Sequence, residues 1–153
     1  MRFLLWPLVL AAFVTGPIMA ADSAIAGLIT VESQHSVAET MDKLEAAAKD
    51  KGLTVFARIN HGAGAERAGL DLAPTQLLLF GNPQGGTPMM QSARSAGIDL
   101  PLKALAWQDG SGQVHLSYND PAWIAERHGI TERAPIVEKM QGLLRSLAQA
   151  ATR

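Results

Sequence analysis

The sequence predicts an α+β fold: a mainly antiparallel sheet of about five strands, with helices packed chiefly on one face, plus an extra C-terminal helix. Leu77–Phe80 is a short apolar run bounded by Pro74 and Gly81, which is typical of a strand buried on both faces in the middle of a sheet. Asp109–Gly112 has the composition of a hairpin turn between two further strands. Because a hairpin replaces the strand–helix alternation after residue 101, a doubly wound sheet is not expected.

The other elements follow from hydrophobic periodicity and from residues that begin or end helices. A capping box at Ser36–Glu39 should begin the first helix, and Gly52 should end it. In the second strand, alternation places Val55 and Ala57 on one face and Phe56 on the other. Strands are expected over 27–32, 53–59, 102–108 and 113–118, and helices over 37–51, 65–68, 89–95, 121–128 and 135–151.

The segment after the apolar run combines residues that favour a sharp turn and a helix start. Asn82-Pro83 favours a turn, and the pair Gly85-Gly86 gives the backbone freedom that other residues lack. Thr87 is expected to be the N-cap of the next helix and Pro88 its first residue. A buried strand would then end at a turn with free N–H groups, which serves either as a ligand site or as a tight connection.

Length and composition limit the function classes. The 153 residues indicate one domain, and the net charge of −1 gives no electrostatic reason to bind nucleic acid or anionic lipid. The chain has no cysteine, which excludes disulfides, thiol catalysis and thiolate metal sites.

The N-terminus has the pattern of a signal peptide over 1–26. Arg2 supplies the positive charge, the run 3–14 is apolar, and Gly16-Pro17 precedes small residues, with cleavage expected somewhere in 20–26. The run is shorter than the roughly 20 apolar residues of a spanning helix, so no stable membrane span is expected after the signal is removed. The protein is therefore expected in the periplasm of a bacterial cell or outside it.

Several blocks in order along the chain resemble the family called domain of unknown function 302. The resemblance covers residues 27–130 and leaves 131–153 as a C-terminal helical extension. It implies a small α+β domain that forms a homodimer, with no established reaction and no catalytic residue to carry over. The blocks are GLTVFARINH at 52–61, PTQLLLFGNP at 74–83, GTPMM at 86–90, DLPLK at 99–103, SYNDP at 117–121 and RHG at 127–129.

Polar residues at the ends of predicted strands form the candidate ligand site. His61 follows the second strand, Asn82 follows the third, Thr87 begins the helix after it, and Tyr118 ends the fifth. Clefts at strand ends beside a helix N-terminus collect ligands, because unpaired N–H groups and polar side chains converge there. We therefore expect these four residues to gather around one cleft, unless their polar groups serve only the backbone of the turn.

The other candidate residues have simpler structural interpretations. His35 is expected at the surface, His115 toward solvent or a partner, and His128 at a helix C-terminus where it complements the dipole. No histidine pair has the helical spacing of a metal site, and Met89-Met90 is expected to pack in the core.

Three functions are consistent with the sequence. The first is a small periplasmic binding or interaction module that acts as a homodimer and takes a small-molecule or anionic ligand. The second is a small enzyme that uses His61 with Tyr118 or Asp99 for acid–base chemistry. The third is a metal-binding protein with histidine and methionine ligands. The sequence names no cofactor.

Overall fold

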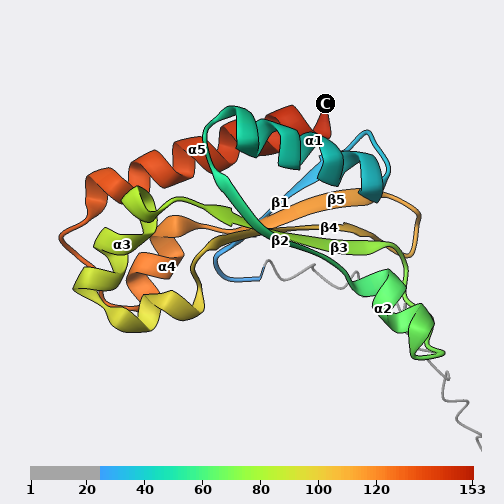
Figure 1. Ribbon diagram of the computed structural model, residues 1–153, viewed down its shortest axis with the longest axis horizontal. Helices are drawn as coiled ribbons and strands as arrows, with labels where there is room; N and C mark the ends of the chain where they lie inside the picture. Colours follow the sequence, from blue (N-terminus) through green and yellow to red (C-terminus); the bar gives the residue numbers. More distant parts are fainter. Residues whose placement is uncertain (1–24) are drawn as a thin grey trace, which may run out of the picture.

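The protein, a computed structural model that describes residues 25–153, is built on one five-stranded sheet (Figure 1). All neighbouring strands are antiparallel, in the order β1-β5-β4-β3-β2. The signal peptide expected over 1–26 lies almost wholly outside the described residues. The strands are β1 (Leu28–Ser33), β2 (Thr54–Asn60), β3 (Thr75–Gly81), β4 (Leu102–Gln108) and β5 (Val114–Asn119).

The two longest helices, α1 and α5, lie side by side over the same face of the sheet (Figure 1). Three shorter segments, α3, η1 and α4, gather at one end of the sheet, and α2 lies at the other end (Figure 1). The predicted α+β fold with helices chiefly on one face is confirmed. The helices are α1 (Val37–Asp50), α2 (His61–Arg67), α3 (Pro83–Ser92), the 3₁₀ helix η1 (Arg94–Ile98), α4 (Pro121–Arg127) and α5 (Ala134–Thr152).

The hydrophobic core lies between the sheet and these two long helices. Met41 and Leu44 of α1, Leu144 and Leu147 of α5, and Phe80 of β3 are all fully buried. Burial of each such side chain contributes about 1.5–3 kcal/mol to stability. Helix α5 is thus part of the same core as the sheet.

Strand β3 is an interior strand between β4 and β2, as its apolar run predicts. Its two faces differ, however. Leu78 and Phe80 face the helices and are fully buried, whereas Leu77 and Leu79 on the opposite face are only half-buried. The expectation of burial on both faces was therefore wrong for the second face.

An extra residue interrupts the pairing of β2 with β3. Val55 is opposite Phe80 and Ala57 is opposite Leu79, so Phe56 between them has no partner. This β-bulge places Val55 and Ala57 on opposite faces of the sheet, which corrects the strict alternation expected from sequence. Phe56 itself is 56% exposed.

We call the face of the sheet opposite α1 and α5 the open face. Most of its apolar side chains come from three adjacent strands, as the pairing of Ile59 with Leu77 and of Leu77 with Leu105 shows. Ile59 is 41% exposed and the others are half-buried. On β2, β3 and β4, the apolar residues of the open face are Ala57, Ile59, Leu77, Leu79, Leu105 and Trp107.

The predicted hairpin joins β4 to β5 and is held by Asp109. Its carboxylate accepts hydrogen bonds from the backbone N–H groups of Ser111 (2.9 Å) and Gln113 (3.0 Å). It also bonds His115 Nε2 at 2.8 Å, and the His115 ring stacks on Trp107 with centroids 4.7 Å apart. The hydrogen bond with His115 is the main cause that holds the pKa of Asp109 well below its usual range, and the bonds from Ser111 and Gln113 lower the pKa further.

Among residues 25–153, no helix combines the length and the hydropathy that a membrane span requires.

Among the glycines in residues 25–153, Gly27, just before β1, should be the least tolerant of substitution. Its φ is +75°, and a Cβ there would fall within the ring of Trp123 in α4. We expect Gly27→Ala to lower the free energy of unfolding in urea by about 3 kcal/mol, the sum of left-handed strain and overpacking.

The matched control is Gly52→Ala. Gly52 has a φ of +71° but no atom within 4 Å of the added Cβ, so this change should cost only about 1 kcal/mol. Equal losses in the two variants would show that contact with Trp123 contributes nothing.

Candidate functional site

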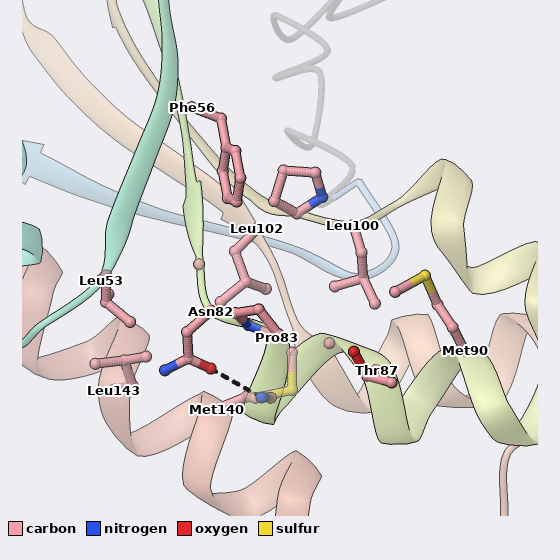
Figure 2. Close-up of a pocket in the computed structure, with 14 residues that line it drawn as sticks. Leu53, Phe56, Asn82, Pro83, Thr87, Met90, Leu100, Leu102, Met140 and Leu143 are labelled. Carbon is pink, nitrogen blue, oxygen red and sulfur yellow. Dashed lines mark hydrogen bonds between the residues drawn. The ribbon is translucent and has the colours of Figure 1, made fainter.

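A pocket of about 270 Å³ opens where β3 ends and α3 begins (Figure 2). Phe56 of β2 and Leu102 of β4 form one side of it, and Met140 and Leu143 of α5 approach from the other (Figure 2). Because these four side chains come from three elements, β2, β4 and α5, the folded sheet and α5 must both be present to form the pocket.

The turn that borders the pocket is fixed by Asn82. Asn82 is the N-cap of α3, and its Oδ1 accepts a hydrogen bond of 2.8 Å from the Gly85 N–H (Figure 2). Pro83 takes the first helical position, where its missing N–H has no cost. The expectation that Thr87 caps this helix and Pro88 begins it was wrong, because Asn82-Pro83 provides the same cap and first residue five positions earlier.

The two glycines of the turn lie in the first part of α3 and leave the pocket open. A Cβ at Gly86 would lie 3.8 Å from Leu100 Cδ1 and 3.9 Å from Met90 Cε, both of which line the pocket. These are ordinary van der Waals distances, so a side chain would fit without a backbone clash and would occupy pocket volume.

The pocket suits an apolar ligand better than an anion. The N–H groups of Gly85 and Gly86 both donate to Asn82, the latter to its backbone oxygen at 3.2 Å. No lysine, arginine or histidine is among the residues that line the pocket in the described part of the chain. The positive end of α3 is therefore already used by its own cap.

The four residues expected around one cleft do not all meet. Asn82 and Thr87 line the pocket. His61 follows Asn60, which pairs with Gln76 near the start of β3, whereas the pocket adjoins Gly81 at its end. His61 thus lies at the opposite end of the sheet from Thr87, because β2 and β3 run in opposite directions.

Tyr118 lies at the pocket end of the sheet but does not line the pocket. It pairs with Ala104 of β4 and Ile29 of β1, and only 4% of it is exposed. Burial is the main cause that raises the pKa of its phenol, and the charge of Asp120 adds to it while that of Arg145 opposes it. Its position is that of a core residue beneath the helices.

The methionine pair divides between core and pocket. Met89 is fully buried in the core, and Met90 lines the pocket. Within residues 25–153, no group of three or more histidine, aspartate or glutamate side chains is placed to hold a metal ion.

Sequence reasoning missed a cluster at the pocket end of the fold. Asp99 follows η1, and its Oδ2 lies 2.7 Å from Nε2 of His128, the C-cap of α4. Nδ1 of the same ring lies 2.9 Å from Oγ of Ser95. The expected partner of Asp99 was His61, and His128 was assigned only a role at a helix end. The one available signal was that Asp99 and His128 both fall in blocks of the family resemblance.

Both ring nitrogens of His35 also have partners. Nδ1 of His35 lies 3.2 Å from Glu39 Oε1, and its Nε2 lies 3.0 Å from the backbone oxygen of Arg153. These contacts join the start of α1 to the end of α5, and only 19% of the His35 side chain is exposed.

Comparison with known proteins places the chain in a family. The model of the family described as "Domain of unknown function DUF302" matches residues 29–147. The chain is a member of the DUF302 family. The matched residues extend from β1 to most of α5. A crystal structure of a DUF302 protein from Bacillus stearothermophilus has the same fold, with a TM-score of 0.74 and 21% identity, over 84% of this chain and 100% of that one.

Curated relatives of this DUF302 protein carry the name of a channel. A protein of Brucella suis biovar 1 and one of Brucella abortus biovar 1, both named "Fluoride-specific ion channel FluC 1", are 61% identical to it over 104 residues. The match covers 68% of this chain but only 41% and 38% of those proteins. The chain thus spans about two-fifths of the length of these relatives.

Proposed function

We propose that this DUF302 protein is an exported binding module that acts as a homodimer and takes a small, largely apolar ligand in the pocket at the start of α3. The 270 Å³ pocket is the observation that carries the proposal. An apolar cavity of about 150 Å³ is large enough for benzene, so this one has room for a ring with a short substituent. Export is inferred from the N-terminal sequence pattern.

The polar groups at the pocket indicate one polar end on the ligand. Asn82 uses its Oδ1 to cap α3, which leaves its amino group to donate to a ligand. Thr87, one turn further along α3, supplies a hydroxyl at the pocket lining (Figure 2). Apolar walls with a few polar groups are usual in small-molecule sites, where the walls supply affinity and the polar groups fix orientation.

A thermal-shift screen tests this proposal. Ring compounds with one hydrogen-bond acceptor should raise the melting temperature of the wild-type protein, because a ligand at 100 times its Kd stabilises the folded state by about 2.7 kcal/mol. Gly86→Leu should abolish the shift, since the new side chain would fill the space toward Leu100 and Met90.

The matched control is Gly64→Leu in α2, where a Cβ would meet only Arg67 Nη2 at 4.0 Å. Gly64→Leu and His61→Ala, both at the other end of the sheet, should bind as the wild type does. The proposal fails if no compound stabilises the wild type, or if Gly86→Leu still binds while folded.

The open face supports the homodimer. Six of its apolar side chains form a continuous patch across three strands, and such patches on antiparallel sheets pack against a second sheet in sandwich folds. A second copy of the chain offers a surface of the same shape and polarity, as a two-fold interface requires.

Light scattering after size-exclusion chromatography tests the dimer. The wild type should have the mass of two chains, and Ile59→Lys should have the mass of one, because it would bury an unpaired charge in the interface. Leu70→Lys is the control, since Leu70 is 68% exposed and lies outside the open face. A monomeric wild type, or an Ile59→Lys dimer, would contradict the proposal.

A second candidate function is an accessory role beside a fluoride channel. The channel relatives are much longer than the segment that matches, and the described part of this chain has no helix able to cross a membrane. We propose that ion conduction resides in the part of those relatives that this chain does not match, and that the DUF302 part assists it.

This role predicts a fluoride phenotype. Cells that lack the protein should grow more slowly than the parent in sodium fluoride but equally well in sodium chloride of the same ionic strength. Expression of the wild-type protein should restore growth. Equal growth of the two strains in fluoride would rule out the accessory role.

A further inference from the structure

Three side chains outside the pocket form a continuous hydrogen-bonded chain of carboxylate, imidazole and hydroxyl. Asp99 Oδ2 lies 2.7 Å from His128 Nε2, and His128 Nδ1 lies 2.9 Å from Ser95 Oγ. Ser95 belongs to η1 and Asp99 directly follows it, whereas His128 ends α4 about thirty residues later. The tertiary packing of two separate segments therefore creates the cluster.

Burial increases from the hydroxyl to the imidazole. The side chains of His128 and Asp99 are only 7% and 10% exposed, while Ser95 is exposed to solvent. The other carboxylate oxygen of Asp99 contacts Arg127 Nη1 at 3.3 Å. The Asp99 carboxylate is thus held between Arg127 and the His128 imidazole. The Ser95 hydroxyl, at the other end of the hydrogen-bonded series, is accessible to a reactant.

When Asp99 is ionised and His128 is neutral, the positions of the three groups determine which ring nitrogen carries the proton. An ionised carboxylate only accepts hydrogen bonds, so Nε2 of His128 must carry the proton that it donates to Asp99. In the neutral ring, Nδ1 then carries a lone pair and accepts the hydrogen bond of the Ser95 hydroxyl. This is the arrangement of a general base bonded to a potential nucleophile.

We propose that Ser95 is a nucleophile activated by His128, and that it accepts the acyl group of small activated esters. The Ser95 oxygen would form a bond to the acyl carbon while its proton passes to His128 Nδ1. Collapse of the tetrahedral intermediate would break the bond to the leaving alcohol, which takes that proton. Water would then attack the acyl-serine with His128 again as base, releasing the acid and restoring Ser95.

In the well-known Ser-His-Asp triad, the aspartate bonds Nδ1 and the serine bonds Nε2. Here Nε2 bonds the aspartate and Nδ1 bonds the serine. As in that triad, one ring nitrogen donates to the carboxylate and the other accepts from the hydroxyl. Asp99 would be a positioning residue that fixes the tautomer of His128. The inference concerns a site other than the ligand pocket and does not depend on what the pocket binds.

A fluorophosphonate probe tests the nucleophile directly, because Ser95 would form a bond to phosphorus as fluoride leaves. The folded wild-type protein should be labelled at Ser95, as located by peptide mass spectrometry. Ser111 is an internal control, since its exposed hydroxyl bonds the carboxylate of Asp109 at 2.7 Å with no imidazole between them, and it should not react. Absence of label at Ser95 in the wild type would overturn the proposal.

Variants separate activation from a purely structural role. His128→Asn should slow labelling about 100-fold or more, the usual range for loss of a general base. Asp99→Asn should also slow it, because an amide can donate to Nε2 and so favour the wrong tautomer, and Asp99→Glu should recover part of the rate. Hydrolysis of p-nitrophenyl acetate should follow the same order.

Circular dichroism would confirm that each variant is folded before rates are compared. Equal labelling rates in the wild type and a folded His128→Asn variant would show that the imidazole does not activate Ser95. If His128→Asn does not fold, Ser95→Ala in the wild-type background decides: its hydrolysis of p-nitrophenyl acetate should fall to the uncatalysed rate, and an unchanged rate would overturn the proposal.

Discussion

The structure depends on one asymmetry: a five-stranded sheet has two long helices, and both pack on the same face. Leu44 of α1, Leu147 of α5 and Phe80 of β3 are fully buried in the layer that this packing creates. The opposite face keeps half-buried apolar residues such as Leu77 and Leu105. A single core therefore stabilises the domain, and the surfaces left for function lie at its ends and on its second face.

Patterns within one segment were enough to predict most of the fold. Ser36 caps α1 and the hairpin at Asp109–Gly112 forms as expected, because each depends on hydrogen bonds between near neighbours in sequence. The Glu39 carboxylate contacts His35, a pairing that the capping box did not predict. The start of α3 was misplaced because both Asn82-Pro83 and Thr87-Pro88 have the composition of a cap followed by proline. The structure uses the first pair, and nothing in the local sequence decides between them.

The site was predicted less well, because it depends on strand direction and on contacts between distant segments. His61 and Thr87 are separated because β2 and β3 run in opposite directions. The sequence alone did not establish the order or the direction of the strands. Asn82 and Thr87 both line the pocket, because they adjoin a glycine turn after an interior strand. Ser95 and His128 are 33 positions apart, and no local pattern relates them.

The bulge at Phe56 also affects how the sheet meets other chains. Strand β2 is at an edge, where unpaired N–H and C=O groups can act as a template for a strand from another molecule. The extra residue breaks the regular spacing of those groups and adds local twist. Phe56, which lines the pocket, therefore also makes the free edge of β2 a poorer template for edge-to-edge pairing with another strand.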